Sequence, residues 1–218
     1  MNKNFKKLGL LVLLIGLILS LAGCASKEKQ LIKALEKFED ETSCQVLMTL
    51  EVSGMSMEVL MKIDGNKTQT EIDVFGSKVV SYTELDEETN IITTYQQLEN
   101  EWYITKTENP NSESILEGLT PEDFVYDEEL EKYVAEDIEL AGLLDSMGDM
   151  FEGMGEVDFK DVRVELTLED GIVSVMDINF KLSMDGMSVN YAMTMTFSEY
   201  GNVTITIPEE AYNGTVSE

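Results

Sequence analysis

Residues 172–197 read IVSVMDINFKLSMDGMSVNYAMTMTF, and apolar side chains occupy every second position over most of this stretch. Polar side chains of Asp, Asn, Lys, Ser and Thr fill the positions between them. Because successive side chains of a strand point to opposite faces, this period of two predicts two strands, each with one apolar face. Asp185-Gly186 lies between them, and Asp-Gly is typical of a tight hairpin turn. The stretch therefore predicts an antiparallel hairpin with one face in a core and the other in water.

The same period of two extends to both sides of this hairpin, through residues 44–107 and 157–208. Short turn signals such as Asp64-Gly65-Asn66 and Asp170-Gly171 separate the apolar segments. Together the two regions predict about ten strands, and an open sheet of that size curls strongly. We therefore expect a mostly β (α+β) fold, in which a large curled antiparallel sheet, a half-barrel, is covered by two or three helices.

Two regions supply the expected helices. Leu31, Leu35 and Phe38 lie at helical spacing within residues 27–41. Residues 113–156 form an acidic insert in which the only basic side chain is that of Lys132. This region predicts a helical insert whose apolar stripe covers the sheet. The residues of the stripe are Leu140, Leu144, Met147, Phe151 and Met154.

The N-terminal 24 residues contain a basic start, an apolar run and a cysteine. Three lysines precede residues 8–21, an apolar run shorter than the about 20 residues that span a membrane. Leu21-Ala22-Gly23-Cys24 follows and resembles the lipobox of bacterial lipoproteins. The resemblance implies that residues 1–23 are a signal peptide and that Cys24 carries fatty acids such as palmitate on the extracytoplasmic face of the cell membrane. The alternative is an uncleaved N-terminal anchor in which Cys24 is a small buried residue.

The chain is strongly acidic, with 43 Asp and Glu against 15 Lys and Arg and a net charge of −28. Phosphate backbones need a basic surface, so nucleic acid is excluded as a partner. The absence of histidine excludes His-dependent catalytic triads and His-ligated zinc. No spacing singles out an acid and a base among the carboxylates, so we expect no enzymatic activity, no metal site and no cofactor. An anionic membrane surface would repel this chain, so the lipid on Cys24 has to provide the anchor.

Several features together resemble Gram-positive lipoproteins of the LolA/LppX-like type. They are the lipobox Cys24, the strand run 176–197, the acidic insert between two β halves, and residues 203–210, VTITIPEE. The resemblance covers most of residues 24–218. It implies a single domain, a half-barrel with a helical lid, and a cavity that holds acyl chains. It carries over no ligand residue.

Methionine is frequent, with 13 in the chain, and its side chain adapts its shape and lines promiscuous apolar surfaces. We expect a lipid or other apolar ligand to bind in a cavity between the sheet and the lid. Phe180→Ala would then cost less stability than the loss of a packed core residue, because part of the ring would face unfilled space. The residues expected to line the cavity are Met48, Met57, Met61, Met176, Ile178, Phe180, Met193 and Met195 on the sheet, and Leu144, Met147 and Phe151 on the lid.

Two alternatives remain open. Methionine can simply fill a core of awkward shape, in which case the protein is a structural or interaction lipoprotein of the envelope without a small-molecule ligand. Met147, Met150 and Met154 share one helical face, and thioethers prefer Cu(I), so Cu(I) capture is a remote alternative. Cys44 has no basic cluster beside it, which predicts a buried structural thiol. The sequence identifies neither a protein partner nor an oligomeric state.

Overall fold

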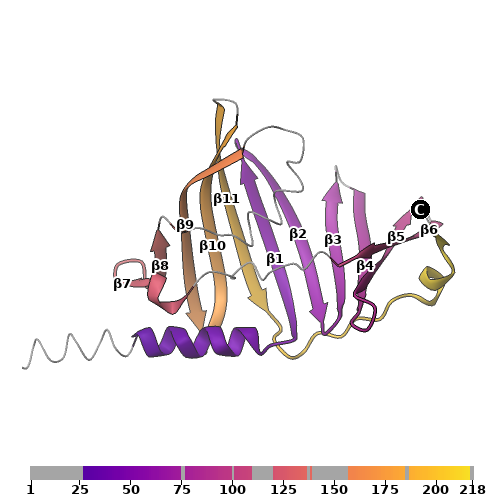
Figure 1. Cartoon of the computed structure of the whole chain (residues 1–218), viewed down its shortest axis with the longest axis horizontal. Coiled ribbons are helices and arrows are strands. Elements are labelled where there is room, and N and C mark those ends of the chain that lie inside the picture. The colour runs from indigo at the N-terminus through magenta and orange to yellow at the C-terminus, as the bar shows by residue number, and fades with distance from the viewer. Residues whose placement is uncertain are drawn as a thin grey trace, which may run out of the picture.

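The structure is a computed structural model that describes residues 27–74, 77–99, 101–109, 120–136, 138, 157–184 and 187–216. These residues form one sheet of 12 strands, in the order β12-β6-β5-β4-β3-β2-β1-β11-β10-β9-β8-β7 (Figure 1). The first half contains β1 (Ser43–Val52), β2 (Met55–Asp64), β3 (Lys67–Val74), β4 (Ser77–Asp86), β5 (Ile91–Leu98) and β6 (Glu101–Glu108). The second half contains β7 (Val125–Asp127), β8 (Lys132–Glu136), β9 (Val157–Glu169), β10 (Ile172–Met184), β11 (Met187–Ser198) and β12 (Thr215–Val216).

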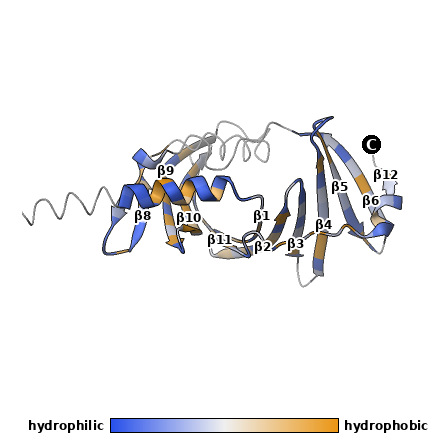
Figure 2. Cartoon of the chain, turned by 90° about the horizontal axis from the view of Figure 1, so that it is seen from below, coloured by the Kyte–Doolittle hydropathy of each residue, from blue (hydrophilic) through white to orange (hydrophobic). Residues whose placement is uncertain are grey.

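The two halves are joined by the pairing of β1 with β11. Their antiparallel register runs from Gln45 opposite Ser198 to Val52 opposite Tyr191. Every pair in the sheet is antiparallel except β12 with β6. The sheet stays open, because its edge strands β7 and β12 do not meet, and it curls so that β4–β6 stand steeply against β1 and β2 (Figure 2). The prediction of one large curled sheet is confirmed, with 12 strands in place of about ten.

The acidic insert is not wholly helical, which corrects the sequence-based prediction. Within residues 113–156, β7 and β8 form a hairpin, and β8 pairs with β9. Tyr133 and Ala135 are buried and the residues on either side of them are more exposed, so the burial of this short segment has the period of a strand. Because acidic residues surround this segment, its period of two was not recognised in the sequence. The predicted apolar stripe from Leu140 to Met154 lies outside the described residues.

The described residues contain one α-helix, residues 27–39, where two or three helices were predicted. Its sequence is rich in Lys, Glu, Gln, Leu and Ala, which are strong helix formers. Leu31 and Ala34 are fully buried on its apolar side. Two short 3-10 helices, η1 (Pro121–Asp123) and η3 (Glu209–Asn213), are the other helical elements of this part of the chain. No helix among the described residues is long and apolar enough to span a bilayer.

The helix crosses β8, β9 and β10 and defines the inner face of the sheet (Figure 2). Phe38 near the end of the helix packs edge-on against Phe197 of β11, with 4.9 Å between ring centroids. Phe197 is paired with Val46, and directly opposed residues of antiparallel strands share a face. The main core therefore lies between the helix and the inner face of β1 and β8–β11, which we call the helix end of the sheet.

Beyond β2 the row of the inner face that contains Val46 becomes polar. The register leads from Val46 to Met61 on β2 and then to Thr70 on β3. From there it continues to Ser81 on β4 and Gln96 on β5. In this row β3–β5 place hydroxyl and amide side chains where the strands at the helix end place Val and Met, whereas the neighbouring row keeps Ile72 and Val79 in line with Val59.

At β4–β6, which we call the far end, the buried apolar residues lie on the outer face instead. Tyr82, Tyr95 and Ile104 are opposed across β4, β5 and β6, and Tyr95 and Ile104 are buried. Residues 203–214, the C-terminal segment, cover them, with Ile207 and Ala211 completing this second cluster. Residues 203–208 were predicted as a closing strand, but they run extended without joining the sheet. The sheet thus buries opposite faces at its two ends.

Candidate functional site

The predicted cavity residues of the sheet all lie on the inner face. Met48 is opposed to Met195, and Met195 to Met176, which makes a row of three methionines across β1, β11 and β10. The next row joins Leu50 to Met193 and Ile178 in the same way. Met57 extends the second row onto β2, opposite Leu50, and Met61 lies on the same face, opposite Val46. The structure therefore brings together the methionines that the alternation assigned to one face.

The part of this face that β10 forms is densely packed. Met176 and Ile178 are each 1% exposed, and Phe180 is 4% exposed. The Phe180 ring stacks on Tyr191 at 5.0 Å between centroids and also contacts Phe159 at 5.6 Å. These side chains have the burial of core residues.

Toward the β1–β2 turn the inner face opens. Leu50 is half-buried, Met57 is 43% exposed and Met55 is 71% exposed. Leu50 and Tyr191 were not among the predicted cavity residues, although their positions in the alternation place them on this face. Leu144, Met147 and Phe151, the predicted lid residues, lie outside the described residues. The open part of the inner face thus combines exposed methionines with half-buried Leu and Tyr side chains.

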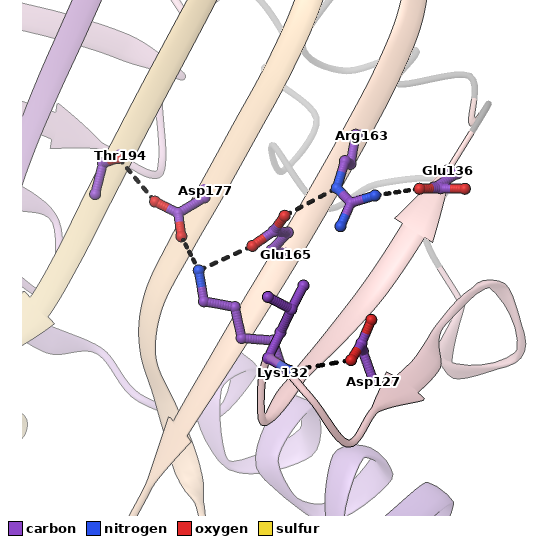
Figure 3. A network of polar contacts seen from close by, with 8 residues as sticks. Asp127, Lys132, Glu136, Arg163, Glu165, Asp177 and Thr194 are labelled. Atoms are coloured by element: carbon purple, nitrogen blue, oxygen red, sulfur yellow. Dashed lines mark hydrogen bonds and ion pairs between the residues drawn. The ribbon is translucent and has the colours of Figure 1, made fainter.

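The outer face of the helix end carries a charged network that the sequence analysis missed (Figure 3). Lys132 Nζ lies 2.8 Å from a carboxylate oxygen of both Glu165 and Asp177. The Thr194 hydroxyl donates to Asp177 at 2.8 Å, so the contacts reach from β8 to β11. Arg163 adds ion pairs to Glu165 and Glu136. These residues come from four strands, and only the sheet register shows that they meet.

The network shifts the proton affinities of its members. The carboxylate of Asp177, and next that of Glu165, raises the pKa of Lys132. Burial acts to raise the pKa of Glu165, but hydrogen bonds from Lys132 and Arg163 outweigh it and leave that pKa lowered. Every charge in the network keeps an opposite partner, and the arrangement holds four strands together. We assign it a structural role.

Among the grooves formed by described residues, two lie largely on the outer side of the sheet. The larger, about 630 Å³, runs beside Glu51, Asn179 and Ala192, which occupy one outer row. The smaller, about 530 Å³, is lined mainly by acids together with Val134 and Arg163. The larger groove also borders Phe180 and Tyr191, but neither groove is lined by a methionine of the inner face.

The remaining candidate groups are few. Cys44 is a buried free thiol, as predicted, and its burial raises its pKa. Among the described residues, no three Cys, Asp or Glu side chains converge in a way that could hold a metal ion. Cys24 and the methionines Met147, Met150 and Met154 lie outside the described ranges.

Comparison with known proteins finds similarity in structure and none in sequence. No family model matches the sequence, and no curated protein is similar to it. The crystal structure of the lipoprotein LppX of Mycobacterium tuberculosis is similar at a TM-score of 0.45 and 11% sequence identity. The similarity covers 84% of this chain and 99% of that chain.

Proposed function

We propose that this protein is a membrane-anchored extracytoplasmic lipoprotein that binds a lipid or other apolar ligand on its inner face. The observation that supports the ligand is the continuity of two regions. The exposed Met55 and Met57 adjoin the half-buried Leu50, which packs against the buried core of the same face. An apolar surface that leads from solvent into a core is the arrangement that an acyl chain or similar ligand can use.

Methionine suits such a surface. Its side chain is unbranched and flexible, so it accommodates ligands of varied shape at small energetic cost. Met57 is followed along its row by Leu50, Met193 and Ile178, so a ligand entering at β2 meets apolar side chains on three further strands. We expect the binding surface to lie in these rows, with the residues nearest the helix forming its floor.

The membrane anchor is supported by the lipobox-like sequence ending at Cys24. The helix begins at residue 27, so very little chain separates the proposed lipid from the folded part. Two acyl chains, at about 0.8 kcal/mol per buried methylene, would hold the protein to the bilayer almost permanently. Cys24→Ser should therefore release the protein from the membrane fraction or block its processing.

The ligand is tested by titrating delipidated, refolded protein with a fluorescent fatty acid. Met57→Lys should weaken binding about tenfold or more, since a charge would stand in the apolar path. Leu47→Lys is the matched control, because Leu47 is 39% exposed and its partners Leu60 and Thr196 place it on the outer face. Equal effects of the two substitutions, or no binding by the unsubstituted protein, would refute the proposal.

A structural or interaction lipoprotein without a small ligand is the second candidate. The near-complete burial of Met176, Ile178 and Phe180 favours it, because these methionine-rich rows then serve as ordinary core. Native mass spectrometry of protein purified from its membrane separates the candidates: co-purifying lipid supports the first and its absence the second. Cu(I) capture rests on residues outside the described ranges and stays a sequence-based prediction. Neither candidate assigns a catalytic reaction to the chain.

A further inference from the structure

The solvent side of the helix formed by residues 27–39 is divided by charge. Lys29, Lys33 and Lys37 follow one another at intervals of four residues, so they form a row along one flank. The 100° step of the helix places Glu28 and Glu39 on the other flank, and Glu36 at the boundary between the two, close to Lys29 in projection. All six side chains are exposed. We call the two sides the lysine flank and the acidic flank.

The three lysines differ from most other cations at the helix end. Lys132 and Arg163 each contact two carboxylates. In the part of the chain that the structure describes, the ammonium groups of the lysine flank have no carboxylate partner within ion-pair distance. In a chain of net charge −28, a row of three unpaired cations is available to an anionic partner.

The start of the helix is fixed to the sheet. The Tyr133 hydroxyl donates to the Lys27 carbonyl oxygen at 3.0 Å, and Lys27 Nζ lies 3.8 Å from the ring centroid of Tyr126. Cys24 precedes Lys27 by three residues, so their Cα atoms are at most about 11 Å apart. If Cys24 carries the proposed lipid, the first turn of the helix is therefore held beside the headgroups.

We propose that the lysine flank lies on the anionic phospholipid surface and sets the orientation of the whole domain. This inference rests on the proposed lipid anchor at Cys24. Each lysine close to an anionic leaflet raises the membrane-binding constant about fivefold. This attraction falls off within a Debye length, which is about 8 Å at physiological salt. The acidic flank and the acidic β7–β8 turn are repelled by the same surface. Attraction on one side and repulsion on the other select one rotation of the helix about its axis.

This orientation has a consequence for the inner face. The helix lies at one end of β9–β11, and the β1–β2 turn lies at the opposite end of the strands (Figure 1). β1 has 10 residues, which span roughly 33 Å at 3.3 Å per residue. The open part of the inner face near Met55 and Met57 then points away from the bilayer. A ligand would enter from the aqueous side rather than directly out of the membrane that holds the protein.

The test uses the full lipidated chain in vesicles, with Cys44→Ala removing the remaining thiol. A fluorophore is attached at Gln30→Cys, beside the lysine flank, or at Glu28→Cys on the acidic flank of the same turn. Vesicles contain equal parts phosphatidylglycerol and phosphatidylcholine, or phosphatidylcholine alone, with a nitroxide quencher on the headgroup. In the anionic vesicles we expect at least about twofold stronger quenching at position 30 than at position 28, lost in 1 M salt, where the Debye length is about 3 Å.

Neutralising the flank gives the decisive comparison. The triple variant Lys29→Gln, Lys33→Gln, Lys37→Gln should abolish the difference between positions 30 and 28. The control Lys62→Gln, Lys106→Gln, Lys181→Gln changes the net charge equally and should preserve it. Equal quenching at both positions, or quenching insensitive to phosphatidylglycerol and to the triple variant, overturns the inference while vesicle flotation still supports the anchor. A chain that fails to float with vesicles overturns the anchor and the orientation together.

Discussion

The two ends of the sheet bury opposite faces, and they do so with different partners. At the helix end, β9–β11 have 12 or 13 residues each and cover their inner face with a helix. At the far end, β5 and β6 have 8 residues each and cover their outer face with the extended C-terminal segment. Between them β3 is mostly half-buried. A single sheet can thus change its buried face along its width when the apolar phase of successive strands shifts by one residue.

Phe180→Ala at the helix end should have the largest effect of the changes considered. The ring is 4% exposed and lies between Tyr191 and Phe159, so its removal should cost about 3–5 kcal/mol of the free energy of unfolding. Urea denaturation followed by circular dichroism measures this loss. A cost well under 2 kcal/mol would favour the earlier expectation from sequence, in which the ring faces unfilled space.

The helix end was largely predictable because its strands alternate strictly. Within 176–184 and 187–197 a large apolar side chain occupies every second position, and the register aligns these rows. At the far end the apolar residues are fewer, and Tyr82, Tyr95 and Ile104 alternate with threonines. The local sequence of such a strand does not predict which of its faces is covered. That depends on the C-terminal segment, more than 90 residues later in the chain.

The candidate site was predictable in part for the same reason. The shared face of Met48, Met176 and Met195 follows from the period of two alone. The increase in side-chain exposure from the packed core to Met57 depends on where the helix lies. The alternation of apolar residues does not predict the position of the helix. The charged network around Lys132 was missed because β8 was taken as part of a helical insert.

Ile104→Ala at the far end should produce a smaller and more local loss. Ile104 is 7% exposed but belongs to a cluster of only a few side chains, so we expect about 2 kcal/mol, the low end for such truncations. Hydrogen exchange should accelerate in β4–β6 and remain slow in β9–β11, because the two clusters are separate. Equal acceleration of hydrogen exchange at both ends would show that the sheet opens as one unit. The two clusters would then not be independent of each other.

Gly214→Ala tests whether the C-terminal segment is fitted closely to β6. A Cβ at this position would lie 2.7 Å from the Trp102 carbonyl oxygen, which is backbone and cannot move aside. We expect the segment to shift from β6, at a cost of about 1–2 kcal/mol. Trp102 is the only tryptophan of the chain, so its fluorescence reports the change directly. Gly54→Ala is the control for space, since nothing lies within 4 Å of a Cβ there, although its positive φ still adds strain.

Lys132→Gln should have the smallest effect and the clearest pH signature. Lys132 joins Glu165 and Asp177, and its side chain is 28% exposed, so solvent screening limits the expected loss to about 1 kcal/mol at neutral pH. Lys181→Gln is the control, because Lys181 is 41% exposed and lies 4.0 Å from Asp161. Its substitution should change the free energy of unfolding by a few tenths of a kcal/mol at most.

The sign of the pH dependence follows from the two pKa shifts. The pKa of Glu165 is lowered in the folded protein, so its contribution is present above the ordinary value of 4.5 and is lost as pH falls through the folded pKa. The pKa of Lys132 is raised, so its contribution is complete below 10.5 and is lost as pH rises through the folded pKa. The difference between the unsubstituted protein and Lys132→Gln should therefore be constant from about pH 5 to pH 10 and shrink on both sides. If the difference in the free energy of unfolding were unchanged at pH 3, the aliphatic stem of Lys132, and not its charge, would be what stabilises this end of the sheet.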